Sequence, residues 1–188
     1  MTIKRKWKII KILIFSFGAV AIIGIATYLL WWYGRFLPGW IEWKTAGAEF
    51  GEGFVTLKDR RLTLRDGGPD GEIAWKTQGD WFVQDMVIKD IDRDGKDELI
   101  LLVWKHGSYG DHMPFWVKKN DKALKQHIFI YKYEPKRETK IRAIWMSSEI
   151  AYEIDSISSG EDCFLNVNDH MGNTRVWYWQ DFGLKLVR

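Results

Sequence analysis

The residues whose types and spacing most clearly suggest chemistry are the acidic side chains of residues 90–98, Asp-Ile-Asp-Arg-Asp-Gly-Lys-Asp-Glu. Asp90, Asp92 and Asp94 alternate, so a tight loop would project their carboxylates to one side. Glu98, at the ninth position of the segment, can supply a closing carboxylate. Hard oxygen ligands in this spacing suit Ca²⁺. The segment therefore predicts a calcium-binding loop.

Two further residues of the same segment fit this prediction. Gly95 at the sixth position permits a sharp turn, and Lys96 at the seventh can offer its main-chain carbonyl as a ligand. An EF-hand is excluded, because its twelfth position would be Leu101 rather than a bidentate Glu and because both flanks have the pattern of strands. The alternative is a solvated Asp-Gly turn between two strands, in which the acids are only polar surface.

The elements that must position this loop are strands. Apolar runs beyond residue 53 are short, rich in β-branched and aromatic residues, and bounded by Gly, Asp, Asn or Pro, which is typical of an all-β domain. No window of useful length has helical periodicity. Eleven strands are expected, over residues 54–57, 61–64, 72–75, 82–88, 99–104, 128–133, 141–145, 151–157, 163–167, 176–179 and 184–187.

These strands form a weak internal repeat of four. The strands that contain residues 62–64, 73–75 and 82–88 resemble those at 128–133, 141–145 and 151–157, and Trp75 and Trp145 occupy matching places. A third, partial copy would start at residue 176. Four antiparallel strands make a propeller blade, but two and a half units cannot close a propeller in one chain. We expect an incomplete propeller or a small sandwich, or closure by a second copy in a homo-oligomer.

Residues 87–102, Val-Ile-Lys-Asp-Ile-Asp-Arg-Asp-Gly-Lys-Asp-Glu-Leu-Ile-Leu-Leu, resemble the FG-GAP/VCBS repeat of integrin-type β-propellers and many bacterial surface proteins. Those repeats carry D-x-D-x-D-G-x-x-D between two strands of a blade and bind Ca²⁺ there. The resemblance implies side-chain ligands from Asp90, Asp92, Asp94 and Glu98, a carbonyl from Lys96, and a role in adhesion or ligand recognition. The ninth position departs from the family pattern, since it is Glu rather than Asp. The second repeat has only Ser-Ser-Gly at residues 158–160, so one metal site is expected.

A second candidate site is the long segment 105–126, which interrupts the repeat. Tyr109, Phe115 and Trp116 could form a platform for a sugar ring or a partner protein. Alternatively, these rings pack over a sheet edge. The same segment contains His106, Asp111 and His112, which could act as metal ligands or as an acid–base set, but their spacing matches no standard zinc motif.

One segment, Ile12–Trp32, predicts a membrane anchor. It has 21 uncharged residues, enough to span the roughly 30 Å hydrocarbon core at about 1.5 Å per residue. Five basic residues, at positions 4, 5, 6, 8 and 11, precede or open it. The positive-inside rule then puts the N-terminus in the cytoplasm and residues 35–188 outside it. A cleaved signal peptide is the alternative, although its apolar stretch is usually shorter and a small-residue cleavage site follows it closely.

The sequence thus predicts three parts. Residues 1–34 are a basic flank and an anchor that contacts the lipid bilayer through residues 12–33. Residues 35–53 are a glycine-containing juxtamembrane connector, and residues 54–188 are an extracytoplasmic β domain.

Charge and cysteine usage narrow the possible functions. The net charge of +3 comes from the flank, since the rest of the chain has 23 basic and 25 acidic residues, and we expect no nucleic-acid partner. The single Cys163 excludes an internal disulfide, which fits a bacterial surface. The leading hypothesis is a non-catalytic, membrane-anchored surface protein that binds Ca²⁺ and an unidentified protein or glycan. The rival hypothesis is an extracytoplasmic enzyme that acts on cell-envelope glycan through residues 105–126.

Overall fold

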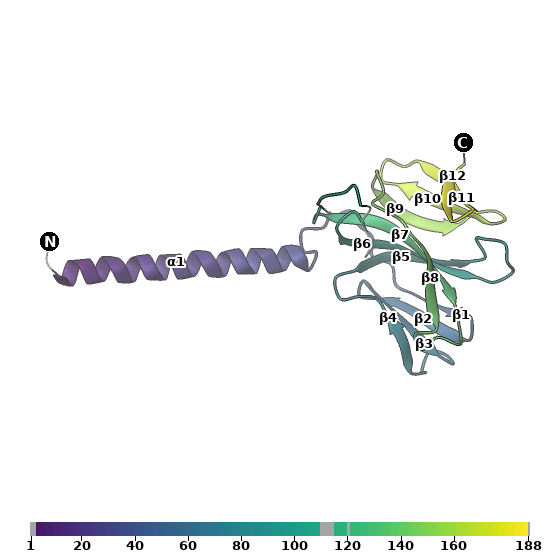
Figure 1. Ribbon diagram of the computed structural model, residues 1–188, viewed down its shortest axis with the longest axis horizontal. Coiled ribbons are helices and arrows are strands. Elements are labelled where there is room, and N and C mark those ends of the chain that lie inside the picture. Colours follow the sequence, from purple (N-terminus) through teal and green to yellow (C-terminus); the bar gives the residue numbers. More distant parts are fainter. Residues whose placement is uncertain (1–2, 110–114, 120, 188) are drawn as a thin grey trace. The chain divides into compact units, whose positions relative to one another are not determined.

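The computed structural model describes residues 3–109, 115–119 and 121–187. The chain divides into two compact units, residues 1–38 and residues 39–188. The first contains a helix and the second a β domain (Figure 1).

The first unit is the helix α1 (Ile3–Trp32). Its segment Ile10–Trp32 is long and apolar enough to cross a membrane, and none of its most apolar stretch is buried. Phe15 and Phe17 are about four-fifths exposed, which the core helix of a soluble protein would not allow. The helix ends in a Schellman motif, in which Gly34 has a φ of 66° and Arg35 donates its N–H to the carbonyl of Leu30 at 2.9 Å.

Within its described residues, the second unit has twelve strands in three antiparallel sheets of four, each connected in sequence order. The first sheet comprises β1 (Ala46–Phe50), β2 (Gly53–Lys58), β3 (Arg61–Asp66) and β4 (Ile73–Lys76). The second comprises β5 (Phe82–Lys89), β6 (Glu98–His106), β7 (Leu124–Tyr133) and β8 (Ile141–Met146). The third comprises β9 (Ile154–Ser159), β10 (Phe164–Asp169), β11 (Thr174–Gln180) and β12 (Gly183–Leu186).

The mainly β prediction is confirmed. The predicted repeat has the right number of strands but the wrong boundaries, because its units group β3–β6 and β7–β10 and each of them takes two strands from one sheet and two from the next. Each of the eleven predicted strands overlaps one of β2–β12. The additional strand, β1, lies where we expected only a connector. Its sequence, Ala-Gly-Ala-Glu-Phe, contains no β-branched residue, so its propensity for a strand is low. Pairing with β2 holds it in place, from Ala46 opposite Leu57 to Phe50 opposite Gly53.

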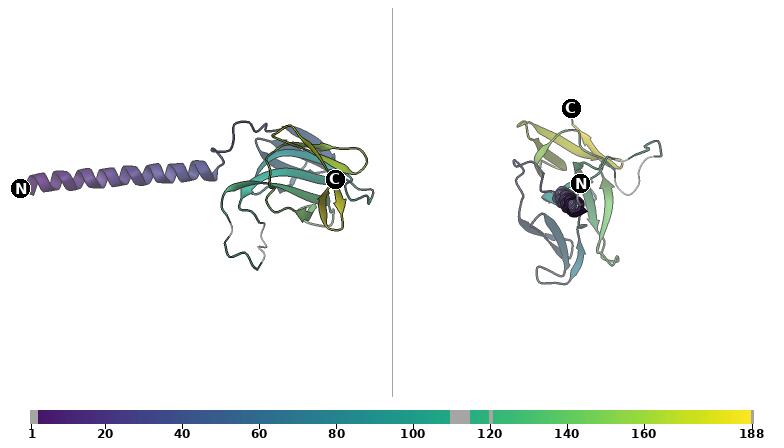
Figure 2. Two further views of the ribbon diagram at one scale, coloured as in Figure 1. Left: turned by 90° about the horizontal axis from the view of Figure 1, so that it is seen from above. Right: turned by 90° about the vertical axis from the view of Figure 1, so that its left-hand side faces the viewer.

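The second sheet lies between the other two, and both of its faces are buried. One face packs with the first sheet around a core that includes Leu64, Leu101 and Phe129. The other packs with the third sheet around a core that includes Ile100 and Leu165. Burial on both faces explains why residues 99–103 of β6 are all apolar and fully buried rather than alternating. In the right-hand view of Figure 2, the third sheet (yellow) lies at the top and the first sheet (blue) at the lower left.

A bulge in β5 joins the second and third sheets. Between Val83 and Asp85 the pairing of β5 with β6 shifts by one residue, which leaves Gln84 as the extra residue. The fully buried Gln84 amide donates to the carbonyl of Ile154 at 3.1 Å and of Asp155 at 2.7 Å on β9. Its oxygen accepts hydrogen bonds from the Trp104 indole (2.7 Å) and the Gln126 amide (2.9 Å). This buried polar group therefore fixes how β9 meets three strands of the second sheet.

Candidate metal site

The acidic segment forms the loop between β5 and β6, and its own side chains hold its shape. Asp90 Oδ2 accepts the N–H of Gly95 at 3.0 Å, Asp92 Oδ1 accepts the N–H of Asp94 at 3.3 Å, and Asp94 Oδ1 accepts the N–H of Lys96 at 3.0 Å. Gly95 has a φ of 83°, a conformation that side chains rarely adopt. The alternation of Asp residues thus folds the loop locally, because short acidic side chains bond to main-chain N–H groups a few residues ahead.

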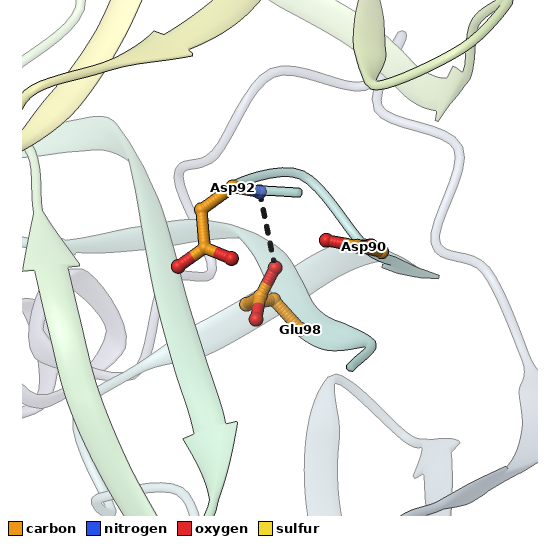
Figure 3. Close-up of side chains that lie close together, drawn as sticks. All are labelled: Asp90, Asp92 and Glu98. Carbon is orange, nitrogen blue, oxygen red and sulfur yellow. Dashed lines mark hydrogen bonds between the residues drawn. The ribbon is translucent and has the colours of Figure 1, made fainter. Parts of the chain in front are cut away.

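Three of the predicted ligands come together. Oxygen atoms of Asp90, Asp92 and Glu98 lie within 4.8 Å of one another (Figure 3). Oxygen ligands of Ca²⁺ lie about 2.3–2.6 Å from the ion, so two ligands of one ion can be at most about 5 Å apart. The three carboxylates satisfy this limit. Among the residues that the structure describes, no other group of three or more His, Cys, Asp or Glu side chains is close enough to hold an ion.

Glu98 is the most buried residue of this cluster. Its side chain is fully buried, and its Oε2 accepts the N–H of Ile91 at 2.9 Å and of Asp92 at 3.4 Å. Burial raises the pKa of Glu98, although these two hydrogen bonds oppose the shift. The first residue of β6 is therefore a carboxylate placed inside the domain and held toward the loop by main-chain donors.

Two buried oxygens of the cluster accept no hydrogen bond from the described residues. They are Oδ1 of Asp90 and Oε1 of Glu98. Glu98 Oε1 has only the Lys132 ammonium, 3.4 Å away, and Asp90 Oδ1 has no hydrogen-bond partner among the described residues. A buried carboxylate oxygen without a hydrogen bond is costly, and such atoms in native proteins usually have an ion or water beside them. The donor set, the spacing and these two oxygens all fit a hard divalent cation such as Ca²⁺.

Lys132 on β7 is the residue of this site that sequence reasoning missed. Its ammonium lies 2.6 Å from Asp92 Oδ2, 2.5 Å from Asp94 Oδ2 and 3.4 Å from Glu98 Oε1. The pairing of β6 with β7 places Lys132 directly opposite Glu98. Lys132 could have been predicted only from the register of β6 and β7, and no local sequence pattern gives that register.

The same contacts perturb the charges of the site. Burial alone would lower the pKa of Lys132, but its hydrogen bonds to Asp92 and Asp94 and the charge of Glu98 raise it above the usual value. The hydrogen bond from Lys132 also lowers the pKa of Asp94. Lys132 is thus a fixed cation that neutralises part of the acidic cluster.

Of the other predicted ligands, Asp94 lies outside the converging set, and the Lys96 carbonyl stays a prediction. Asp94 is not one of the three converging carboxylates and instead bonds to Lys132 and to the N–H of Lys96. Lys96 is exposed. The converging set is therefore Asp90, Asp92 and Glu98, and Lys132 pairs with two of these residues and with Asp94.

The second predicted site is also partly described. Phe115 is 94% exposed and Trp116 69% exposed, and their rings meet edge to face with centroids 4.8 Å apart. This exposure suits a recognition surface rather than rings packed over a sheet edge. Tyr109 is half-buried, and its carbonyl accepts a hydrogen bond from the buried Lys105 at 2.7 Å.

Of the three acid–base candidates in this segment, the structure describes only His106. Nδ1 of His106 lies 2.9 Å from the carbonyl of Lys122, so this ring contacts main chain across the ends of the segment. Asp111 and His112 lie outside the described residues.

No protein-family model matches this chain, and no curated protein matches it either. The resemblance of residues 87–102 to the FG-GAP/VCBS repeat therefore stays a prediction.

Proposed function

We propose that this chain is a single-pass membrane protein whose extracytoplasmic β domain binds Ca²⁺ and serves adhesion or the binding of a surface protein or glycan. The observation that carries the calcium part is the convergence of Asp90, Asp92 and Glu98, two of whose buried oxygens accept no hydrogen bond from the described residues. The FG-GAP/VCBS resemblance of the same loop supports both parts.

Charge balance supports a bound cation. Asp90, Asp92, Asp94 and Glu98 bring four carboxylates to one loop, and the Lys132 ammonium pairs with the last three of them. One ammonium leaves an excess of negative charge around a fully buried Glu98. A divalent ion would offset that excess and reduce repulsion between the acids.

The proposed role of the ion is structural. It would tie the loop to the first residue of β6, in the sheet that lies between the other two. Extracellular modules of this kind bind Ca²⁺ with dissociation constants on the order of 10⁻⁴–10⁻³ M.

Calcium dependence of unfolding tests this proposal. The full chain in detergent should unfold at a higher temperature in Ca²⁺ than in chelator, by an increment of about 2.7 kcal/mol at 100 times the dissociation constant. Asp90→Asn and Asp92→Asn should each remove most of that increment. The quantity to compare is the difference in unfolding free energy between Ca²⁺ and chelator. The unfolding free energy in one condition is not informative, because removing one of several clustered acids also relieves repulsion and can stabilise the domain.

Asp70→Asn, on an exposed turn between β3 and β4, is the matched control and should keep the full increment. Equal unfolding of the unmodified chain in Ca²⁺ and in chelator would refute an ion that stabilises the fold.

The membrane part of the proposal rests on α1. Its apolar span is unburied, and the five basic residues that precede or open the predicted span favour a cytoplasmic N-terminus. The binding part rests on the FG-GAP/VCBS resemblance of residues 87–102. Phe115 and Trp116 are exposed, as rings at contact surfaces are. The rival enzyme hypothesis requires acids or histidines that converge beside these rings, and the described residues supply no observation in its favour.

A further inference from the structure

The exposed rings of Phe115 and Trp116 are followed by a group of lysines. Lys118, Lys119 and Lys122 are all exposed, and none of them forms an ion pair with another described residue. The neighbouring Asp121 does not neutralise them, since it accepts the N–H of Ala123 at 2.9 Å and lies 3.6 Å from Lys125. We refer to Phe115, Trp116, Lys118, Lys119 and Lys122 as the aromatic–basic segment.

This segment lies at the opposite end of β6 from the candidate metal site. Glu98 begins β6 and His106 ends it, a separation of about 25–30 Å at roughly 3.3 Å per residue. The chain then passes through the aromatic–basic segment and returns along β7 from Leu124, which pairs with His106. The segment therefore belongs to the end of the domain where β6 finishes.

The β domain begins at this same end. Trp40, the second residue of the domain, stacks on His170 with ring centroids 4.2 Å apart. The centroid of the Trp40 ring also lies 6.3 Å from that of Trp104, which is two residues before the end of β6. Seven residues, 33–39, separate Trp40 from the last residue of α1, and a fully extended chain of this length reaches at most about 29 Å. If α1 spans a bilayer, this end of the domain is tethered close to the bilayer surface.

We propose that the aromatic–basic segment is a second membrane-contact site, which holds this end of the domain on a bilayer that contains anionic lipid. The inference rests on the proposed anchoring by α1. Trp rings prefer the interface between hydrocarbon and water, Phe rings bury at the boundary of headgroups and acyl chains, and lysines near an anionic surface are attracted to its headgroups. The tether makes binding effectively intramolecular, so a weak contact is enough to keep the segment on the surface.

Depth-dependent quenching in vesicles tests this site. The full chain, with Cys163→Ser, is labelled with an environment-sensitive fluorophore at one introduced cysteine and reconstituted into phosphatidylcholine vesicles with or without phosphatidylglycerol. Phe115→Cys reports on the segment and leaves Trp116 and the lysines in place. Ile22→Cys reports on α1. Lys136→Cys, on the exposed turn after β7, reports on the opposite end of the domain.

Nitroxide-labelled lipid should quench the label at position 115 when phosphatidylglycerol is present, quench position 22 in all vesicles, and leave position 136 unquenched. The triple change Lys118→Glu, Lys119→Glu and Lys122→Glu should shift the equilibrium between bound and free segment by roughly a hundredfold and remove most quenching at position 115. The matched charge change Lys58→Glu, Lys76→Glu and Lys136→Glu, at exposed positions elsewhere, should leave that quenching in place.

The outcomes separate this inference from the anchor on which it rests. Quenching at position 22 without quenching at position 115 would overturn the second contact and leave the anchor standing. Equal loss of quenching in both charge variants would also overturn it, since the attraction would then not be local. Absence of quenching at position 22 would overturn the anchor and this inference together.

Discussion

Lys132 and Asp92 link β7 to the acidic loop, with Nζ of the lysine 2.6 Å from Oδ2 of the aspartate. The ammonium also contacts Asp94 and lies 3.4 Å from Glu98, one of the three converging carboxylates. The proposed calcium ion would therefore share its ligands with a cation that belongs to the protein. Two cations beside one set of acids repel each other, so Lys132 should set how much the domain depends on calcium.

Lys132→Met should increase calcium dependence. In chelator, the variant should lose about 2–4 kcal/mol of unfolding free energy, because a part-buried acidic cluster keeps its charge and loses its fixed partner. In saturating Ca²⁺ the loss should be smaller, since the ion replaces the ammonium. Calorimetry in both conditions measures the difference. Lys140→Met is the control, because that ammonium pairs at 3.4 Å with Asp66 away from the loop. An equal loss in both conditions would show that Lys132 does not compete with an ion.

The buried His127 should make the domain sensitive to mild acid. Its ring nitrogens each lie 3.1 Å from a main-chain carbonyl, of Ser147 and of Gly107, and burial lowers its pKa from 6.5 to about 4. Because the unfolded chain binds the proton more readily, the stability that neutral His127 contributes is complete above about pH 6.5. That contribution is lost as the pH falls toward 4, up to about 3 kcal/mol.

Comparing the unmodified chain with His127→Gln isolates the part of the acid sensitivity that comes from His127. The unfolding free energies of the unmodified chain and of His127→Gln should converge between pH 7 and pH 4, because glutamine can still donate a hydrogen bond but cannot titrate. His170→Gln serves as the control, since that side chain is 43% exposed. If the difference between the unmodified chain and His127→Gln stays constant across this range, burial of His127 does not control the acid response.

Removal of two tryptophan rings should affect the unfolding free energy to very different extents. Trp116→Ala should change the unfolding free energy by no more than about 0.5 kcal/mol, because a ring that is 69% exposed has little packing to lose. Trp81→Ala should cost about 3–5 kcal/mol, since that side chain is 7% exposed and its ring centroid lies 4.9 Å from that of Phe129. Denaturant unfolding of the two variants measures both values. A large loss from Trp116→Ala would mean that its ring supports the fold and is not free for contact.

Orientation in the membrane should follow the N-terminal charges. Protease added to intact spheroplasts should digest an epitope fused after residue 188. Changing the five basic residues that precede or open the predicted span to Gln should place that epitope inside in a substantial share of the molecules, because the cationic flank would no longer be retained. The changed positions are Lys4, Arg5, Lys6, Lys8 and Lys11. Protection of the epitope in the unmodified chain, with digestion only after lysis, would reverse the proposed topology.

The parts of the fold and of the site that were predictable are those set by neighbouring residues. Asp90, Asp92 and Glu98 lie within nine residues, so a single turn brings them together. Short apolar runs bounded by turn residues predicted the strands β2–β12. Lys132 was not predictable because it reaches the loop through the register of β6 and β7. β1 was not predictable because its Gly and Ala residues carry no strand signal and only pairing with β2 holds them. The sequence showed that the aromatic–basic segment contains aromatic rings. It did not show whether these rings are exposed, because exposure depends on how the rest of the chain packs.

The Gln84 bulge also determines how mechanical force would enter the domain. The main-chain N–H of Lys44, near the start of the domain, donates to the carbonyl of Gln84 at 3.0 Å, and the side chain of Gln84 bonds to β9. A pull on residues 39–44 would therefore reach the second and third sheets through this residue. Arg60, in the turn between β2 and β3, accepts the N–H of Val83 at 2.9 Å and lies over the ring of Trp43, so the first sheet is connected at the same point. If a bound partner pulled on the C-terminal sheet, part of the tension would run through Gln84.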